Sequence, residues 1–316
     1  MTKLYKCDFM DNGINFERFV IRACCKSVHS GVERPTLCDS YENIDWQKIK
    51  ERRDIWRKQI AEGNPPVFCK GCSAIQTVNK LNNDDFVYFV DVNSFVKCNS
   101  RCVYCDCWSK KGVKEYSMFP YFQELFSKKL LKQVYYGYIQ FAGGEPALMI
   151  DFDKIIDLCI ENGMQRYIVN SNCIKYSQGI ERLLRETETN LCCSLDSGCE
   201  ETFAKIKNVP CFNQVVENLK KYTDAQQEGK SRVLSKFIII PSYNDSEEEI
   251  IKWYDLSVSL GIKNLVLDIE REWFKSNNQK ITKHMEKMIE LIQKHCKKEG
   301  INLDYYESLK CLYKKV

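Results

Sequence analysis

Apolar residues after position 85 alternate between short runs typical of strands and longer stretches with helical spacing. The expected strands cover residues 86–92, 138–141, 167–170, 191–195, 233–240 and 265–268. The helices expected between and after them cover residues 119–134, 152–160, 180–187, 212–222 and 247–260. Strands that alternate with helices form parallel βα units. The pattern therefore predicts an α/β fold, either an incomplete (β/α)6 barrel or a doubly wound sheet, and it does not choose between these two.

The first 82 residues lack this alternation and contain one clear amphipathic helix, expected at 45–62. Ile49, Trp56 and Ile60 share one face of that helix, and Gly63 with the prolines after it ends the helix. A segment with so little apolar periodicity needs a metal or a neighbouring surface to hold it. We expect a small cysteine-rich domain at residues 1–82, a partial barrel at 83–275 and a helical tail at 276–316, with a helix near 280–298.

The composition is that of a folded protein with a large core. The chain has 316 residues, of which 44% are hydrophobic and 28% charged, which excludes a disordered or collagen-like chain. The net charge of +4 is spread along the chain, so we expect no nucleic-acid partner. No apolar run reaches the roughly 18 residues of a membrane span, and residues 1–20 lack the apolar core of a signal peptide. We therefore expect a cytoplasmic protein without a membrane partner.

Cysteine is the unusual residue type, because 18 of the 316 residues are cysteines. This share is below the roughly 8–10% of a disulfide scaffold, and the chain is much longer than the secreted domains that need such cross-links. In a reducing compartment, grouped cysteines more often bind metal or take part in chemistry. Two groups have the spacing of ligand sets, Cys69 with Cys72 and Cys98 with Cys102 and Cys105.

The second of these groups follows the first expected strand, at the end where parallel barrels build their active sites. One interpretation is a structural zinc site with Cys107 as the fourth ligand. The spacing of Cys105 and Cys107 is tight for two ligands of one ion, and no histidine lies near them in the sequence. Three thiolates in one loop instead favour a [4Fe–4S] cluster with one iron left open.

Two motifs carry a family resemblance. The segment CNSRCVYC at residues 98–105 resembles the CxxxCxxC signature of radical S-adenosylmethionine (SAM) enzymes, including the aromatic residue before the last cysteine. The segment GGEP at residues 143–146 follows the second expected strand, as the GGEP motif of that family does. Adjacent glycines let the backbone approach a ligand closely. The resemblance extends over residues 85–275 and implies an incomplete (β/α)6 TIM-like barrel.

The resemblance also implies a reaction. Cys98, Cys102 and Cys105 would hold three irons of a [4Fe–4S] cluster, and the fourth iron would bind the amino and carboxylate groups of SAM. The reduced cluster would split SAM into methionine and a 5′-deoxyadenosyl radical, which abstracts a hydrogen atom from the substrate. The protein would bind and orient the cofactors and exclude water. An external electron donor of the flavodoxin or ferredoxin type is implied as a partner.

Polar residues at the strand ends extend the expected cofactor site. The positions implied to contact the cofactor are Tyr104, Gly143, Gly144, Glu145, Pro146, Asn172, Ser194 and Lys236. Among them Glu145 would bind the SAM ammonium, Lys236 would meet the SAM carboxylate, and Asn172 or its neighbour Asn170 would face the ribose. The alternative for each is a satisfied polar residue at the end of a strand.

Asp196 and Cys193 are the candidate catalytic residues. The resemblance implies that Asp196 and Ser194 lie at a strand end that contacts SAM. Cys193 or Cys173 would donate a hydrogen atom to a product radical, although a buried cysteine is more often a small apolar side chain. Asp268, at the end of the sixth expected strand, is a further candidate.

The N-terminal cysteines resemble the auxiliary-cluster segment called SPASM or twitch. In that segment a cysteine precedes a hairpin, a Cys-Cys pair closes the hairpin, a helix follows, and a C-x-x-C completes the set. We expect residues 16–23 to form the return strand of the hairpin. The ligands implied for one auxiliary [4Fe–4S] cluster are Cys7, Cys24, Cys69 and Cys72, with Cys25 and Cys38 as substitutes.

This segment departs from the family pattern in two respects. It precedes the barrel here, whereas it normally follows the barrel, and it lacks the cysteines of the two-cluster form. A structural zinc ion held by four thiolates is the alternative. Four protein ligands favour electron transfer or structural support over substrate binding, and the sequence does not choose between those two roles.

The sequence thus predicts a radical SAM enzyme that modifies or matures a peptide or protein, as relatives with SPASM-like segments often do. Because no separate module for binding a leader peptide is evident, a sugar or another small metabolite is the alternative substrate. A methyltransferase is disfavoured because no second, methyl-carrying domain is evident. The alternative outside enzymes is a zinc-stabilised binding protein whose cysteines are purely structural.

Overall fold

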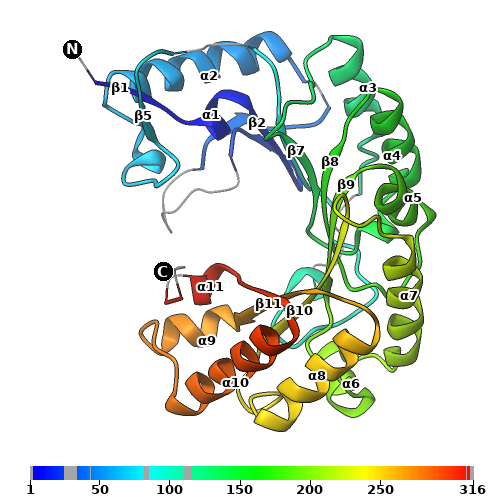
Figure 1. Ribbon diagram of the computed structural model, residues 1–316. Helices are drawn as coiled ribbons and strands as arrows, with labels where there is room; N and C mark the ends of the chain where they lie inside the picture. The colour runs from blue at the N-terminus through cyan, green and yellow to red at the C-terminus, as the bar shows by residue number, and fades with distance from the viewer. Residues whose placement is uncertain are drawn as a thin grey trace. The chain divides into compact units, whose positions relative to one another are not determined.

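The computed structural model describes residues 3–24, 34–42, 44–81, 85–109, 115–310 and 312–313 (Figure 1). The chain divides into two compact units. Unit 1 comprises Met1–Val96, Lys114–Gly143 and Lys154–Tyr167, and unit 2 comprises Lys97–Val113, Gly144–Asp153 and Ile168–Val316. The domain boundaries expected after residues 82 and 275 stay predictions.

Unit 1 combines a small antiparallel pair with part of a parallel sheet. Its strands are β1 (Leu4–Lys6), β2 (Gly13–Glu17), β3 (Ile21–Arg22), β4 (Thr36–Cys38), β5 (Gln76–Val78), β6 (Phe89–Asn93) and β7 (Tyr138–Phe141). Its helices are α1 (Asp8–Asn12), α2 (Trp46–Ala61), the 3-10 turn η1 (Val67–Cys69), α3 (Phe119–Ser127) and most of α4 (Phe152–Glu161). Strands β7, β6 and β2 lie parallel, β3 and β4 continue the sheet antiparallel, and β1 pairs separately with β5.

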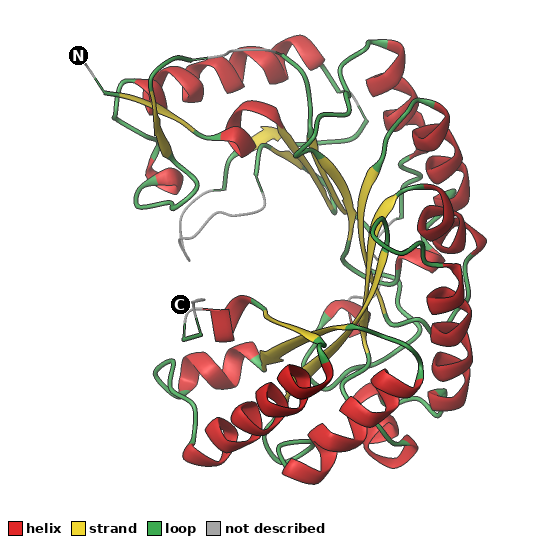
Figure 2. Cartoon of the chain, viewed as in Figure 1, coloured by secondary structure: helices red, strands yellow, loops and turns green. Residues whose placement is uncertain are grey.

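Unit 2 is built from parallel βα units. Its strands are β8 (Arg166–Ser171), β9 (Glu188–Ser194), β10 (Arg232–Ile239), β11 (Asn264–Ile269) and β12 (Asn302–Tyr305), in this order across the sheet. Its helices are α5 (Gln178–Glu186), α6 (Glu200–Lys207), α7 (Phe212–Ala225), α8 (Glu247–Ser259), α9 (Arg271–Ser276), α10 (Lys283–Glu299) and α11 (Glu307–Lys310), with the 3-10 turns η2 (Cys107–Ser109) and η3 (Pro146–Leu148). Helices α5, α7, α8 and α10 pack against its strands on one side (Figure 2).

The apolar pattern of the sequence explains this packing. Every second residue of β8 and β9 is fully buried, while the residues between them are mostly half-buried. Ile180, Leu183 and Leu184 form the buried face of α5, which packs on β9.

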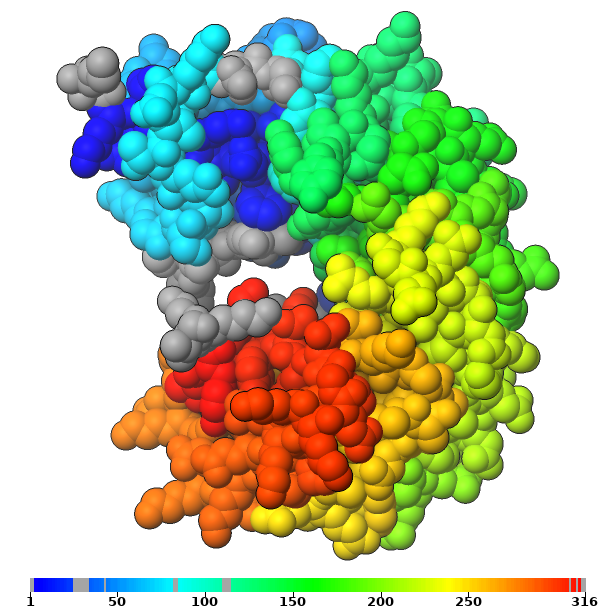
Figure 3. Space-filling model, in the orientation of Figure 1, coloured from blue at the N-terminus to red at the C-terminus, as the bar shows by residue number. Residues whose placement is uncertain are grey.

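In the space-filling view, the residues of α8 to α10, yellow to orange-red, form a continuous outer surface (Figure 3). Within the described ranges, no helix combines the length and apolarity needed to cross a membrane.

The expected strands and helices after residue 85 are observed in the expected order, and most of their bounds agree to within a few residues. The helix expected at 119–134 is shorter, because it ends at Ser127 and Lys129 takes a positive φ of 55°. The chain then forms a bridge between Leu131 and Val87, which extends the sheet beside β6 instead of lengthening the helix.

Other elements were not expected from the sequence. Helices α6 and α9 are short, and β12 adds a parallel strand beside β11. The expected return strand at 16–23 is wrong, because β2 ends at Glu17 and β3 begins at Ile21, so the turn of the hairpin lies inside that range. Strand β2 also runs parallel to β6, which places it beside the first expected strand.

Gly198 follows β9 at a point where the chain passes against α8. A Cβ atom at this position would lie 2.0 Å from the backbone carbon of Lys252. We expect Gly198→Ala to destabilise the fold by about 3 kcal/mol, the upper part of the range for overpacking, because the backbone has to shift. Gly261→Ala, at φ +80° with open space around it, is the control and should cost about 1–2 kcal/mol. Chemical denaturation measures both losses, and equal losses would contradict the close approach.

Candidate functional site

Cys98, Cys102 and Cys105 lie half-buried in a segment of unit 2 that we call the cysteine loop, residues 97–109. The hydroxyl of Ser100 lies between two of them, 3.4 Å from Cys98 Sγ and 3.3 Å from Cys102 Sγ. The Cys105 backbone N–H donates to the carbonyl of Cys102 at 3.1 Å, which forms the turn of the C-x-x-C half. The three thiols therefore belong to one short segment with its own internal hydrogen bonds.

The GGEP turn, residues 143–146, has the geometry that its glycines suggest. Gly143 has φ +109°, and a Cβ atom there would lie 2.9 Å from the carbonyl oxygen of Phe95, so only glycine fits without strain. Glu145 is 1% exposed, and its backbone N–H donates to the carbonyl of Lys97 at 2.8 Å. This bond ties the turn to the first residue of the cysteine loop.

Asn172, after β8, joins the turn to the loop. Its backbone N–H donates to Glu145 Oε2 at 2.7 Å. Its side-chain amide donates to Asn99 Oδ1 at 2.7 Å and lies 3.5 Å from Cys98 Sγ. The hydroxyl of Ser171 donates to Glu145 Oε1 at 2.8 Å. We call the hydrogen bonds that Ser171 and Asn172 donate to Glu145 the cradle. The end of β8, the GGEP turn and the cysteine loop thus meet at one residue.

The Glu145 carboxyl is the buried acid of this arrangement. Burial raises its pKa above the ordinary value, although the hydrogen bonds from Asn172 and Ser171 favour the charged form. Its side chain also accepts from the backbone N–H of Ala147 at 3.2 Å and so caps η3. Pro146, the last residue of the motif, is buried at the start of η3. The carboxylate therefore has structural partners of its own in addition to any ligand.

The expected residues on β9 and β10 separate onto two faces of the sheet. Ser194 and Lys236 are paired in register and are both half-buried, so they share one face. Cys193 is fully buried and points to the other face. A hydrogen bond with Cys173, together with burial, raises the pKa of Cys193 well above the ordinary value for a thiol. The structure thus brings Ser194 and Lys236 together and does not bring Cys193 to them.

Asp196 is fully buried, and both of its carboxylate oxygens have partners. Oδ2 accepts from the Tyr104 hydroxyl at 2.6 Å and from Lys207 Nζ at 2.5 Å. Oδ1 accepts from the backbone N–H of Ile238 at 2.8 Å. The role of Lys207 was not predicted from the sequence. The signal in the sequence is the position of this lysine one turn after Phe203, on the apolar face of α6. The remaining candidate, Asp268, is buried and accepts from the backbone N–H of Ser308 at 3.2 Å.

A cavity of about 550 Å³ lies beside the cysteine loop in unit 2, within the size range of small-molecule sites. Tyr104 and Trp108 of the loop line it, with Ile240, Tyr243 and Trp273 from the chain after β10 and β11. Its described lining includes carboxylates and contains no lysine or arginine. The aromatic side chains of this lining suit a flat group. The absence of a lysine or arginine from the described lining suits a group that carries no negative charge.

Strand pairing brings the segments that carry Cys7, Cys24, Cys69 and Cys72 into one region of unit 1. Strand β1 ends next to Cys7, and its partner β5 begins four residues after Cys72, so this antiparallel pair brings Cys7 to the C-x-x-C turn. In that turn the backbone N–H of Cys72 donates to the carbonyl of Cys69 at 3.1 Å. Cys24 follows β3, which pairs with the strand that leads out of α1.

The thiols of this group also influence one another electrostatically. Burial, together with repulsion from the charges of Cys24 and Cys72, raises the pKa of Cys7 to about 12. Burial also raises the pKa of Cys69 to about 12, with added repulsion from the other three. The substitute Cys38 instead bonds to the carbonyl of Ser40, and Cys25 lies outside the described residues.

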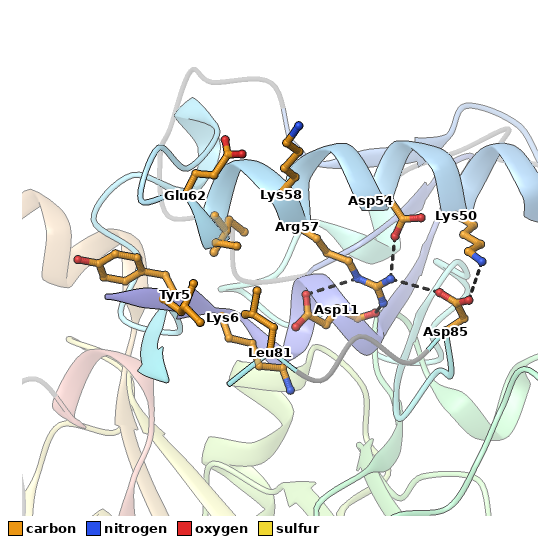
Figure 4. Close-up of a pocket in the computed structure, with 13 residues that line it drawn as sticks. Tyr5, Lys6, Asp11, Lys50, Asp54, Arg57, Lys58, Glu62, Leu81 and Asp85 are labelled. Carbon is orange, nitrogen blue, oxygen red and sulfur yellow. Dashed lines mark hydrogen bonds and ion pairs between the residues drawn. The ribbon is translucent and has the colours of Figure 1, made fainter. Parts of the chain in front are cut away.

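A network of ion pairs holds the segment that carries Cys7 (Figure 4). Arg57 of α2 is buried and donates to Asp54 at 2.9 Å and Asp85 at 3.4 Å, and its Nε lies 3.5 Å from Asp11. Burial raises the pKa of Asp11 to about 6, although the charge of Arg57 opposes this shift. The network lines a cavity of about 600 Å³ in unit 1 and fixes α1 against α2. Its charges are paired within the protein, so we assign it a structural role.

Both cysteine groups fit iron–sulfur ligation by their donor chemistry. In the ranges that the structure describes, no three His, Cys, Asp or Glu side chains are gathered to hold one metal ion. A [4Fe–4S] cluster asks for a different arrangement, because each cysteine binds its own iron at a corner of the cluster. Thiols are the donors that such clusters take. Burial raises the pKa of Cys7 and Cys69, and metal binding would deprotonate both thiols.

Comparisons of sequence identify the family of the partial barrel. The sequence model of the Radical SAM superfamily matches residues 92–254. The GTP 3′,8-cyclase of Clostridium botulinum (strain Okra / Type B1) is 27% identical over 180 residues, which cover 54% of this chain and 55% of that protein. The probable GTP 3′,8-cyclase of Saccharolobus islandicus (strain Y.N.15.51 / Yellowstone #2) is 25% identical over 170 residues, which cover 54% and 53%. The chain spans about half the length of these relatives.

Comparisons of structure agree on the fold. SuiB of Streptococcus suis bound to the precursor peptide SuiA is similar with a TM-score of 0.55 and 12% identity, over 99% of this chain and 75% of that chain. SuiB bound to S-adenosylmethionine is similar with a TM-score of 0.53 and 13% identity, over 85% and 57%. The match to the family and these neighbours confirm the expected α/β fold with an incomplete (β/α)6 TIM-like barrel.

Replacement of Glu145 tests the cradle without any cofactor. Glu145→Ala leaves the hydroxyl of Ser171 and the backbone N–H of Asn172 without an acceptor, so we expect a loss of about 1–3 kcal/mol in the free energy of unfolding. Glu145→Gln keeps one acceptor oxygen and should lose less. Denaturation of both variants in the absence of SAM measures the difference. Wild-type stability of Glu145→Ala would contradict the described hydrogen bonds.

Proposed function

Since the chain belongs to the radical SAM superfamily, we propose that it cleaves SAM reductively at the cysteine loop and uses the resulting radical to modify a peptide or protein. The family makes the chain an enzyme with a [4Fe–4S] cluster and SAM as its cofactors. The proposal is supported by the hydrogen bonds of Asn172. This residue follows β8 and bonds both to Glu145 of the GGEP turn and to Asn99 of the cysteine loop.

Cys98, Cys102 and Cys105 are the proposed ligands of the SAM-binding cluster. When bound, the reduced cluster supplies the electron that splits SAM into methionine and a 5′-deoxyadenosyl radical. Ser100 hydrogen-bonds to two of the ligand sulfurs, and Asn172 fixes the loop against the GGEP turn. Hydrogen bonds to ligand sulfurs and exclusion of water both tune such a cluster.

The cofactor-binding residues take the roles that their positions allow. Glu145 receives the SAM ammonium while it keeps its donors from β8, and Gly143 with Gly144 lets the backbone approach. Ser194 and Lys236 present a hydroxyl and a cation on the half-buried face of the sheet, where Lys236 suits the SAM carboxylate. The cavity beside Tyr104 suits the flat, uncharged adenosyl group.

A peptide or protein is the substrate that we favour. SuiB in complex with its precursor peptide is similar over 99% of this chain, which includes the N-terminal cysteines. The similarity to the cyclases of C. botulinum and S. islandicus covers only 54% of the chain. A small metabolite remains the second candidate, because GTP is the substrate in the names of those relatives. Mass spectrometry of candidate peptides and of GTP, each incubated with the reduced enzyme and SAM, distinguishes the two.

The N-terminal cysteines are the proposed ligands of one auxiliary [4Fe–4S] cluster, with Cys7, Cys24, Cys69 and Cys72 as the set. The burial of Cys7 and Cys69 and the pairing of β1 with β5 support this proposal over a set that includes Cys38. Because all four ligands come from the protein, electron transfer or structural support is the proposed role. A flavodoxin- or ferredoxin-type protein is the proposed electron donor, and the cytoplasmic location stays a prediction.

Loss of one loop cysteine should abolish SAM cleavage. We expect Cys102→Ala to form no 5′-deoxyadenosine above background with dithionite under anaerobic conditions, because only two of the three cysteine ligands of the cluster would remain. Cys38→Ala, in a cysteine outside both proposed ligand sets, is the matched control and should keep wild-type cleavage. Chromatographic assay of 5′-deoxyadenosine measures both, and equal activity of the two variants would refute the assignment.

Loss of one N-terminal cysteine should remove the auxiliary cluster and spare the first. The wild-type protein, purified without oxygen, should hold about eight iron and eight sulfide per chain if each group binds one [4Fe–4S] cluster. Cys72→Ala should hold about four of each and still cleave SAM. Iron and sulfide analysis provides the count. An unchanged count for Cys72→Ala, or zinc in place of iron in the wild type, would overturn the auxiliary cluster.

A further inference from the structure

The middle of the cysteine loop is docked onto the last turn of α6. The backbone N–H of Arg101 donates to the carbonyl of Lys207 at 2.9 Å, and that of Val103 donates to the carbonyl of Ile206 at 3.0 Å. Carbonyls in the last turn of a helix have no partner within the helix. Asn208 ends α6 in the left-handed conformation, with φ 56°, and so leaves these two carbonyls to the loop.

A buried ion pair lies directly beneath this docking point. Lys207 is 1% exposed and Asp196 is fully buried, and Lys207 Nζ lies 2.5 Å from Asp196 Oδ2. The Tyr104 hydroxyl bridges them, because it accepts from Lys207 Nζ at 2.9 Å and donates to Asp196 Oδ2 at 2.6 Å. Tyr104 lies in the sequence between the proposed cluster ligands Cys102 and Cys105. Its two hydrogen bonds therefore attach the loop to the buried ion pair.

The ion pair is itself fixed by the strands. Asp196 Oδ1 accepts from the backbone N–H of Ile238, and the Asp196 carbonyl accepts from the side-chain amide of Asn244 at 2.9 Å. Burial disfavours a charged lysine, yet the pKa of Lys207 lies above its ordinary value because the Asp196 carboxylate attracts the charge. Removal of one partner of a buried ion pair leaves an uncompensated charge and strongly destabilises the fold. Lys207 and Asp196 are therefore expected to stay paired.

We propose that Lys207, Asp196 and Tyr104 form a buried clamp that holds the cysteine loop in its ligating conformation before a cluster binds. This assigns Asp196 and Lys207 as positioning residues that act through Tyr104 and the loop backbone. The proposal rests on the proposed role of the loop cysteines as cluster ligands. It adds a second consequence, because Lys207 Nζ lies 2.9 Å from the hydroxyl of Tyr104 and so places a cation against the loop.

Hydrogen exchange of the full-length protein without iron tests the clamp, because it needs neither cluster nor SAM. The amides of Arg101 and Val103 should be protected in the wild type. They should exchange at least about tenfold faster in Tyr104→Phe, which removes one hydroxyl, and faster still in Asp196→Asn. Lys205→Met is the matched control, since Lys205 lies on the same helix in an exposed pair with Glu201 and should leave both amides protected. Unchanged exchange in Tyr104→Phe and Asp196→Asn would overturn the clamp.

The reduction potential of the reconstituted protein supplies a readout that loss of packing alone would not produce. Lys207→Met removes the cation that contacts Tyr104 of the loop, so the potential of the loop cluster should become more negative, whereas Lys205→Met should leave it unchanged. Equal potentials for Lys207→Met and the wild type would overturn the electrostatic part of the proposal. If the amides respond as expected but the wild type cleaves no SAM, the clamp stands and the proposed function fails.

Discussion

The buried ion pair of Lys207 and Asp196 is the interaction on which the arrangement of the cysteine loop depends. Removing two charges from water is costly, and proteins tolerate such pairs when hydrogen bonds satisfy the remaining polar atoms. Here Tyr104 and the backbone N–H of Ile238 supply those bonds. The same contacts join α6, the end of β9 and strand β10 to the loop. The requirement to satisfy two buried charges therefore fixes the segment that carries the three loop thiols.

The two cysteine groups reach their geometry by different physical routes. The cysteine loop depends on side-chain and backbone bonds to α6 and to Asn172 within unit 2. The N-terminal group depends on strand pairing, because β1 and β5 bring Cys7 to the turn of Cys69 and Cys72 within unit 1. In both groups the thiols are partly or fully buried, and each thiol would release its proton when it binds a metal. This environment suits iron–sulfur clusters in both places.

Much of the fold and the position of the site could be predicted from the sequence. Regular alternation of apolar runs located the strands and helices after residue 85, and the motif spacing located the cysteine loop and the GGEP turn. The partners of Asp196 could not be predicted, because Lys207 lies on a short helix whose register is set by tertiary packing. The pairing of β2 with β6 was also hidden, since a parallel pairing between distant segments leaves no local signal. Cys193 shows the same limit, because one step along β9 decides which face it occupies.

The central claim is that the three thiols near position 100 hold a cluster with one open iron that binds SAM. Electron paramagnetic resonance of the anaerobic, dithionite-reduced protein before and after addition of SAM tests this claim directly. The account predicts a reduced [4Fe–4S] signal whose shape changes when SAM binds, and the loss of this change when Cys98 is replaced by alanine. A spectrum that SAM leaves unaltered, or a protein without any iron–sulfur signal, would contradict the account.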